Sequence, residues 1–169
     1  MYPLKNKGQY LETILNITNQ KYLNEQICVV TKIPTNINLI NIKNKMITNA
    51  TFKDNFNCDY IGVYNSVYFE FDAKETSKDS FNFNALRKNQ QNKLELVEQQ
   101  KGLAFIILYF SYYDDFYLIT YKQLKEYTTK YKKTIPRQWI VENCIELFLT
   151  SSLKLDYVKH FNHLINQIC

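Results

Sequence analysis

The first pattern in the chain is a set of apolar residues with helical spacing near the N-terminus. Leu11, Ile14, Leu15 and Tyr22 are separated by intervals that include three, four and seven residues. This spacing places side chains on one face of a helix. A helix is therefore predicted over residues 10–24, with its apolar face turned toward a core.

Apolar runs of strand-like length and one further helical pattern follow. Strands are predicted over residues 26–32, 36–42, 59–64, 67–73, 102–110 and 116–121. A helix is predicted over residues 86–100, and two or three more helices are expected after residue 121. Strands interleaved with helices in this order predict a mixed α/β fold, with a central sheet flanked by helices. The length of 169 residues predicts a single domain spanning residues 1–169.

Two of the predicted strands form a hairpin whose register follows from its turn. Asn65 and Ser66 suit a two-residue turn between these strands. Counting outward from that turn, Asp59 lies opposite Asp72. Directly opposed side chains in an antiparallel pair have Cβ atoms about 4.5–5.5 Å apart, on one face of the sheet. The hairpin is thus expected to direct two carboxylates toward the same place.

The same alternation divides the hairpin into an acidic face and an apolar face. Asn57, Glu70 and Lys74 share the face of the two aspartates. The opposite face carries aromatic residues expected in a core, namely Tyr60, Tyr64, Phe69 and Phe71. One interpretation of the acidic face is ordinary solvent exposure, which is usual for charged residues. The other is a metal site, because opposed carboxylates destabilise a strand pair unless something compensates their charge.

A divalent cation would give the acidic face a function. Mg²⁺ prefers hard oxygen ligands, often one or two carboxylates completed by waters and a substrate phosphate. Asp59 and Asp72 are therefore candidate ligands, with Mn²⁺ as the alternative metal. Lys74 is a candidate for stabilising the charge that develops on a phosphate under attack.

The net charge of +5 favours a polyanionic partner, and the basic residues are unevenly placed. Residues 122–137 carry six basic residues and one acid. The candidate DNA contacts in this segment are Lys130, Lys132 and Lys133. Interleaved aromatic residues that could stack on nucleic acid are Tyr121, Tyr127 and Tyr131. A solvated helix face is the alternative, since lysine-rich helices are common.

Composition argues against several other classes of protein. A membrane span requires a run of about 18 apolar residues, which the sequence lacks, and MYPLKNKGQY has no apolar stretch of the signal-peptide kind. A cytoplasmic protein is expected. The four cysteines have no C-x-x-C spacing, which predicts reduced thiols in place of a zinc site or disulfides. The two histidines lie near the C-terminus, which argues against a histidine metal site.

Several short segments form a recognisable set along the chain. They are NKGQYLE (6–12), KIPT (32–35), CDYIGVY (58–64), FDAKET (71–76), SF (80–81), Gln90, GLAFII (102–107) and LDYV (155–158). The set resembles the PD-(D/E)xK nuclease superfamily and, within it, the RecU-type Holliday junction resolvases. An acid-x-Lys pattern alone is common in proteins. FDAKET together with the other segments is specific for this family. The resemblance covers nearly the whole chain in order.

The resemblance implies a restriction-endonuclease-like fold and a Mg²⁺-dependent endonuclease that resolves four-way DNA junctions in recombination and repair. It implies metal ligands at Asn57, Asp59, Asp72 and Gln90, and a transition-state role for Lys74. Two positions depart from the family, which has Thr where this chain has Asn57 and Glu where it has Asp72. These departures raise the alternative of a junction-binding, recombinase-modulating protein with weakened catalysis. A restriction-type nuclease acting on linear duplex is a third hypothesis.

The resemblance further implies a projecting stalk and a homodimer. In the family the stalk enters the centre of the junction, and here it corresponds to residues 41–57, with Lys43, Lys45 and Lys53 as candidate DNA contacts. An ordinary surface hairpin is the alternative. Symmetric cleavage of two strands requires two active sites related by a two-fold axis, so a homodimer is expected. Recombination proteins are further candidate partners.

Glu12, Gln90 and Glu70 each have a structural and a functional interpretation. Glu12 lies in the first turn of the N-terminal helix, where an acid complements the helix dipole regardless of function. The resemblance instead suggests that Glu12 supports a metal-bound water. Gln90 lies early in a predicted helix, where polar residues are ordinarily solvated, and only its spacing after SF marks it as a ligand. Glu70 is a candidate supporting residue because it shares the acidic face.

Overall fold

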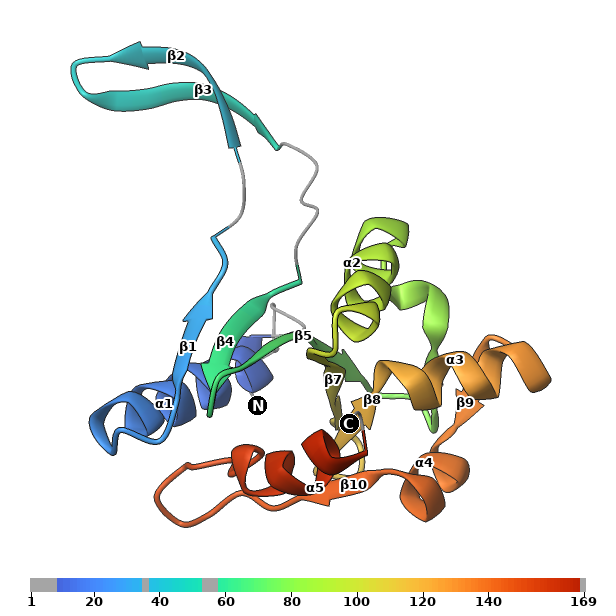
Figure 1. The fold of residues 1–169 in the computed structure, drawn as a ribbon. Helices are drawn as coiled ribbons and strands as arrows, with labels where there is room; N and C mark the ends of the chain where they lie inside the picture. Colours follow the sequence, from blue (N-terminus) through green and yellow to red (C-terminus); the bar gives the residue numbers. More distant parts are fainter. Residues whose placement is uncertain (1–8, 35–36, 53–57, 168–169) are drawn as a thin grey trace.

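The structure is a computed structural model that describes residues 9–34, 37–52 and 58–167. Its α-helices are α1 (Gln9–Asn24), α2 (Lys88–Gln99), α3 (Tyr121–Lys130), α4 (Arg137–Asn143) and α5 (Phe161–Asn166), with 3₁₀ turns at Phe83–Ala85 and Val158–His160. Its strands are β1 (Val29–Lys32), β2 (Ile37–Lys43), β3 (Met46–Phe52), β4 (Tyr60–Tyr64), β5 (Val67–Thr76), β6 (Ser80–Asn82), β7 (Leu103–Phe110), β8 (Asp115–Thr120), β9 (Thr134–Pro136) and β10 (Ile145–Leu147). The mixed α/β class predicted from the sequence is confirmed (Figure 1).

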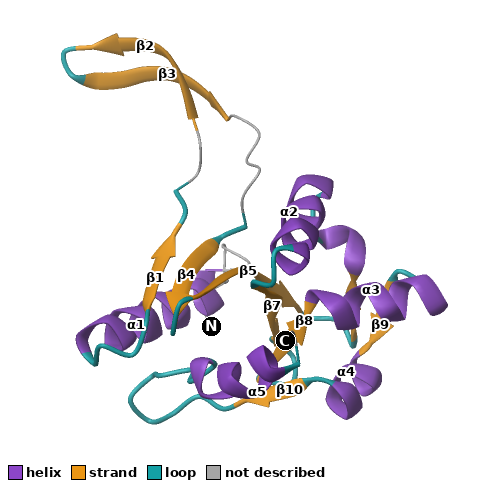
Figure 2. Cartoon of the chain, viewed as in Figure 1, coloured by secondary structure: helices purple, strands orange, loops and turns teal. Residues whose placement is uncertain are grey.

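A six-stranded sheet in the order β1-β4-β5-β7-β8-β10 forms the centre of the fold (Figure 2). β5 and β7 run parallel, and the other neighbouring strands are antiparallel. A parallel pair needs a crossover connection, and α2 lies within the crossover from β5 to β7. The helix is thereby brought next to β5, which carries Glu70 and Asp72.

Helices cover both faces of this sheet, and alternation along β7 separates two cores. Phe105 and Ile107 belong to the core that includes residues of α1 and α5, whereas Ile106 and Leu108 belong to the core that includes residues of α2, α3 and α4. Every residue of β7 is buried, as expected for a strand that is covered on both faces. The continuous apolar run predicted as a strand at 102–110 therefore lies at the centre of the molecule.

The β4–β5 hairpin has the register predicted from its turn. Tyr60 lies opposite Phe71, and their rings stack with centroids 4.8 Å apart. Asn65 and Ser66 both have positive φ, 46° and 66°, as a type I′ turn requires. This turn matches the right-handed twist of the flanking strands, so the short connection fixes which residues face each other.

β2 and β3 form a hairpin that projects from the rest of the molecule (Figure 1). Its tip is formed by Asn44 and Lys45, whose φ angles are 51° and 63°. The projecting hairpin is confirmed. Its paired strands span 37–52, so it begins before the predicted range of 41–57, and residues 53–57 of that range lie outside the described residues. The sequence pattern does not predict β3, because its asparagine and threonine residues weaken the apolar alternation that marks a strand.

The sequence pattern also misses three short strands. β6 pairs with β9 in a separate two-stranded ribbon, and β10 pairs with β8 at an edge of the main sheet. Each has three residues, too few to show a period. The predicted strand at 26–32 begins later, at Val29, because the Ile27 N–H donates to the Tyr22 carbonyl (2.9 Å) in the turn that ends α1.

The close approach of strands at Gly62 generates the first prediction. A Cβ at this position would clash with the Phe69 ring and the Val29 carbonyl oxygen. Gly62→Ala is therefore expected to lower the free energy of unfolding by about 1–3 kcal/mol, measured by urea denaturation. Val63→Ala, at an exposed neighbouring position, is the control and should cost less than about 1 kcal/mol. Equal losses for the two variants would contradict the packing argument.

Candidate active site

The carboxylates of Asp59 and Asp72 converge where the β4–β5 pairing ends. Strand pairing stops with Tyr60 opposite Phe71, and the two aspartates are the next residues outward. Asp59 Oδ2 accepts a hydrogen bond from the backbone N–H of Ala73 on β5 (3.1 Å). The structure therefore brings the two predicted acids together.

Asp72 is fully buried and contacts two polar side chains. Gln90 Nε2 donates to Asp72 Oδ1 at 2.5 Å, and Lys74 Nζ forms an ion pair with Asp72 Oδ2. Among the described residues, Oδ2 still accepts no hydrogen bond of ordinary geometry. Burial raises the pKa of Asp72 to about 7, an effect opposed by Lys74 and reinforced by Asp59. A carboxylate in such a position gains strongly from a cation placed beside it.

The solvent-exposed interpretation of the acidic face is wrong for its two central residues. Glu70 and Asp72 each have 0% relative accessible surface, and α2 packs against the strand that carries them. Lys74 keeps 20% of its side chain exposed, and Asp59 is half-buried. Solvent therefore reaches the site beside Asp59 and Lys74.

Glu70 shares this face but has partners for both of its carboxylate oxygens. Its Oε1 accepts from the Cys58 backbone N–H (2.9 Å), and its Oε2 accepts from the Tyr68 hydroxyl (2.7 Å). Lys93 Nζ lies 3.6 Å from Oε2. These bonds hold Cys58, the residue before Asp59, against β5. The geometry therefore supports a positioning role for Glu70.

Gln90 is the third residue of α2 and connects this helix to Asp72. Its Oε1 accepts a hydrogen bond from the Arg87 backbone N–H (3.0 Å), while its amide nitrogen donates to Asp72. The structure thus places Gln90 beside Asp72, and its role as a metal ligand stays a prediction. Its carbonyl oxygen, the side-chain atom able to bind a metal, caps the helix in this arrangement.

Glu12 extends from the first turn of α1 and pairs with Lys32 of β1. Its Oε2 lies 2.5 Å from Lys32 Nζ, and both side chains are partly exposed. The Tyr60 hydroxyl approaches the Glu12 backbone carbonyl at 3.5 Å. Burial raises the pKa of Tyr60, and Glu12 and Asp59 add to that effect. Glu12 therefore lies within electrostatic range of the acidic site while its carboxylate is engaged by a lysine.

Three residues of this site were not identified from the sequence: Cys58, Tyr68 and Lys93. Burial raises the pKa of the Cys58 thiol, and Asp72 and Glu70 add to the effect, so the thiol stays protonated. Two signals were available: Tyr68 shares a strand face with Glu70, and Lys93 follows Gln90 by one helical turn. Cys58 carried no such signal, although its free thiol agrees with the prediction of reduced cysteines.

The described residues fit a cation that uses few protein ligands. They contain no cluster of three or more His, Cys, Asp or Glu side chains that could hold a metal. The pair Asp59 and Asp72 supplies hard oxygen atoms. The buried Oδ2 of Asp72 accepts no hydrogen bond of ordinary geometry from any described residue, although Lys74 forms an ion pair with it. Mg²⁺ commonly uses one or two carboxylates and keeps several waters. Asn57, the other predicted ligand, lies outside the described residues.

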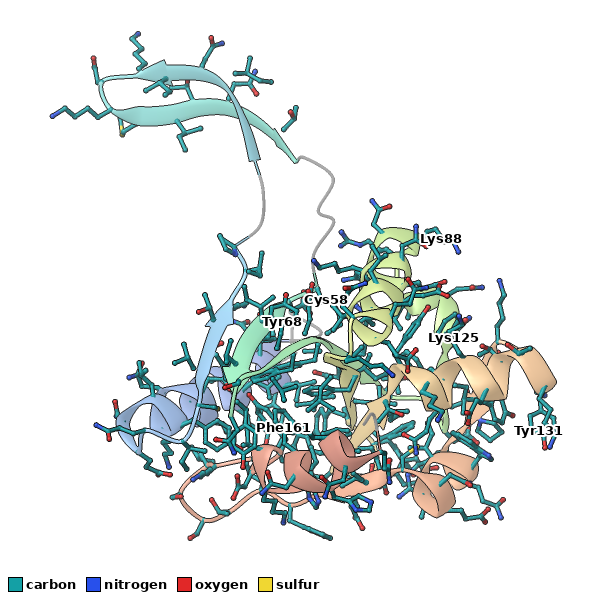
Figure 3. The ribbon with its side chains drawn as sticks, in the orientation of Figure 1. Cys58, Tyr68, Lys88, Lys125, Tyr131 and Phe161 are labelled. Atoms are coloured by element: carbon teal, nitrogen blue, oxygen red, sulfur yellow. The ribbon has the colours of Figure 1, made fainter. Side chains whose placement is uncertain are left out.

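The predicted DNA-contacting lysines lie in two separate places. Lys43 and Lys45 are exposed at the tip of the projecting hairpin, and Lys53 lies outside the described residues. Exposed lysines also occur at and after the end of α3, namely Lys130, Lys132 and Lys133. That end of α3, marked by Tyr131, lies away from Cys58 in Figure 3.

The interpretation that three tyrosines near these lysines could stack on nucleic acid or hydrogen-bond to its backbone is wrong for two of them. Tyr121 and Tyr127 have 2% and 7% relative accessible surface and belong to a hydrophobic core. Tyr131 is 61% exposed. The helical periodicity of α3 places Tyr121 and Tyr127 on its buried face, whereas Tyr131 follows the end of the helix.

The sequence matches the RecU family, described as Recombination protein U, over residues 6–163. A Holliday junction resolvase RecU from Ureaplasma parvum serovar 3 is 32% identical over 161 residues, which cover 95% of this chain and 94% of that protein. A Holliday junction resolvase RecU from Staphylococcus saprophyticus subsp. saprophyticus is 31% identical over 169 residues, which cover 94% of this chain and 81% of that protein.

The fold is also similar to a solved structure of Hjc, a Holliday junction resolvase from Archaeoglobus fulgidus. The TM-score is 0.51 at 12% identity, with coverage of 82% of this chain and 90% of that chain. At this identity the likeness concerns the fold alone, and it agrees with the central mixed sheet. No described helix of this chain is long and apolar enough to span a membrane.

The buried bonds of Glu70 generate the second prediction. Glu70→Ala would leave the Cys58 backbone N–H and the Tyr68 hydroxyl without their acceptor, so a loss of about 1–3 kcal/mol in the free energy of unfolding is expected. Glu70→Gln keeps the shape and one acceptor, and should cost less. Urea denaturation measures both. Glu95→Ala is the control, because its pair with Lys125 is partly exposed and is worth less than about 1 kcal/mol. A Glu70→Ala loss no larger than this control would refute the positioning role.

Proposed function

This chain belongs to the RecU family, and from that premise we propose that it is a metal-dependent endonuclease that resolves Holliday junctions. The reaction is hydrolysis of phosphodiester bonds in four-way DNA during recombination and repair. The observation that carries the proposal is the convergence of Asp59, Asp72 and Lys74 on one partly open face, beside Gln90 of α2. An enzyme acting on chromosomal junctions would work in the cytoplasm.

Asp59 and Asp72 would hold Mg²⁺, or Mn²⁺ as the alternative, together with Asn57 and the side chain of Gln90. A bound Mg²⁺ supplies two effects: it lowers the pKa of a coordinated water, and it takes up charge on the scissile phosphate. Asp72 is fixed by its bond from Gln90, and Asp59 by its bond from the Ala73 N–H. These bonds hold the two carboxylates ready for the cation, which lowers the cost of ordering them on binding.

Lys74 would stabilise the negative charge that develops on the phosphate. Its ammonium contacts Asp72 Oδ2 in the structure, so it lies beside the carboxylate that would hold the cation. With a cation held by Asp59 and Asp72, the Lys74 ammonium would no longer be needed to balance the Asp72 charge and could contact the phosphate. The partial exposure of Lys74 supports this role, because the substrate arrives from solvent.

The projecting hairpin would contact the junction itself. Lys43 and Lys45 carry positive charge at its tip, and Lys53 follows the hairpin in the sequence. A homodimer with two-fold symmetry would bring two active sites to strands of the same polarity. Recombination proteins are candidate partners of the assembled complex.

A junction-binding protein with weakened cleavage is the second candidate. The observation that favours it is the pair of departures from the family residues, Asn57 in place of Thr and Asp72 in place of Glu. Asp72 is shorter by one methylene and is fully buried, so its reach toward a cation depends on the position of β5. Such a protein would bind four-way DNA and modulate a recombinase without cutting.

Cleavage assays on a synthetic four-way junction and on linear duplex of the same sequence test the proposal. With Mg²⁺, the junction should be cut and the duplex left intact, and EDTA should abolish cutting because the water and phosphate lose their cation.

Asp59→Asn and Lys74→Ala should each lower cleavage by about 100-fold or more, while junction binding changes only a few-fold. Binding without cleavage in the parent protein would favour the second candidate, and equal cutting of linear duplex a restriction-type nuclease.

Asp72 provides a further prediction at the same site. Asp72→Glu restores the family residue and should keep or raise Mg²⁺-dependent cleavage, because the longer side chain extends the carboxylate toward the cation. Asp72→Asn removes the charge at nearly constant shape and should be inactive. Junction cleavage measured over a Mg²⁺ titration compares the three proteins. Cleavage by Asp72→Asn at the parent rate would exclude Asp72 as the second acid and leave Glu70 as the remaining acid on this face.

A further inference from the structure

An aromatic groove lies between the end of α3 and helix α4. It has a volume of about 290 Å³ and is lined by Tyr127, Tyr131, Pro136, Gln138, Trp139 and Glu142. The Tyr127 ring centroid is 5.0 Å from that of Tyr131 and 4.7 Å from that of Trp139. The proposed cleavage reaction uses none of these residues, and Figure 3 places Tyr131 away from Cys58 of the acidic site.

Tyr131 presents its ring to solvent from a defined backbone position. Its side chain is 61% exposed, although a tyrosine of this size is usually more buried. Its backbone N–H donates to the Tyr127 carbonyl at 2.9 Å, which fixes it at the end of α3. Lys130 Nζ lies 5.3 Å from the ring centroid, within cation–π range. The groove therefore has one exposed, supported aromatic wall.

Three lysines flank Tyr131 along the chain, and one of them, Lys130, lies over its ring. Lys130, Lys132 and Lys133 are exposed, and no ion pair of theirs occurs within the part of the chain that the structure describes. Other cations of the same segment are engaged, since Lys125 pairs with Glu95. The three exposed lysines are thus available to a polyanion.

We propose that this groove binds an unpaired nucleotide of single-stranded DNA. Single-stranded nucleic acid is recognised by aromatic side chains on which bases stack, combined with a basic surface that follows the phosphates. Tyr131 and Trp139 supply the aromatic surfaces, and the lysines supply the charge. This site goes beyond the proposed cleavage reaction, and it operates without a metal.

The polar lining of the groove suits an unpaired base better than a base within a duplex. Gln138 Nε2 donates to Glu142 Oε1 at 3.0 Å, and these two side chains offer donors and acceptors to the edge of a base. Glu142 is negative, so the phosphates belong on the side of Lys132 and Lys133. Bases within a duplex have both faces stacked and cannot enter such a groove. A proline-rich peptide would use the aromatic walls but would leave the lysines without a role.

Trp139 is the single tryptophan of the chain, so its fluorescence reports on the groove alone. The full-length protein is titrated in EDTA with an oligothymidine of about 12 nucleotides, which spans the usual site size. Binding should quench Trp139 emission. Tyr131→Ala should weaken binding by about tenfold, the loss of one stacking contact. Tyr112→Ala is the matched control, because Tyr112 is also exposed and lies outside the groove lining.

Three results would overturn the proposal. The first is the absence of quenching by oligothymidine at low salt. The second is equal affinity of the Tyr131→Ala and parent proteins, which would mean that the lysines bind DNA by charge alone. The third is quenching by a proline-rich peptide that oligothymidine cannot displace. Junction cleavage with Mg²⁺, measured in parallel, should persist in Tyr131→Ala, so failure of this proposal and failure of the resolvase proposal give different results.

Discussion

The register of the β4–β5 hairpin is the constraint on which the rest of the site depends. A shift by one residue would move every side chain to the opposite face of the sheet, which would place Asp72 in the aromatic core and Phe71 among the polar groups. The two positive φ angles of the turn and the stacked rings of Tyr60 and Phe71 select one register. Local turn chemistry and core packing therefore determine where the acids lie.

Burial of Glu70 and Asp72 beneath α2 determines the electrostatics of the site. Charged groups removed from water are tolerated only with partners. The two buried acids of the described residues, Glu70 and Asp72, have different sets of partners. Glu70 receives a backbone N–H, a hydroxyl and a lysine. Asp72 receives the Gln90 amide and an ion pair from Lys74, and its Oδ2 accepts no hydrogen bond of ordinary geometry from the described residues. The first arrangement favours a fixed backbone, and the second leaves a position where a cation is favourable. Two acids on one strand face thus acquire different properties from their surroundings.

Much of this arrangement could be predicted from the sequence, because it depends on short-range patterns. The helix at α1, the buried strand β7 and the convergence of Asp59 and Asp72 follow from spacing and a two-residue turn. The partners Tyr68, Lys93 and Cys58, and the burial of Glu70, depend on how α2 packs across the sheet, and that long-range contact has no local signal. β6, β9 and β10 were missed for the same reason, since strands this short exist only through their neighbours. The burial of Tyr121 and Tyr127 likewise depended on which face of α3 meets the sheet.

The double engagement of Gln90 links the helix to the acid thermodynamically. One side-chain amide caps the first turn of α2 and also donates to Asp72. Because one amide makes both bonds, a change in the free energy of one bond changes that of the other. Such coupling is reciprocal between helix capping and contact with Asp72. A ligand that reorients Asp72 therefore changes the equilibrium between the folded and frayed first turn of α2. By the same reciprocity, unfolding of this turn lowers the affinity for that ligand by the same factor. The stability of the first turn of α2 is therefore linked to any ligand that binds Asp72.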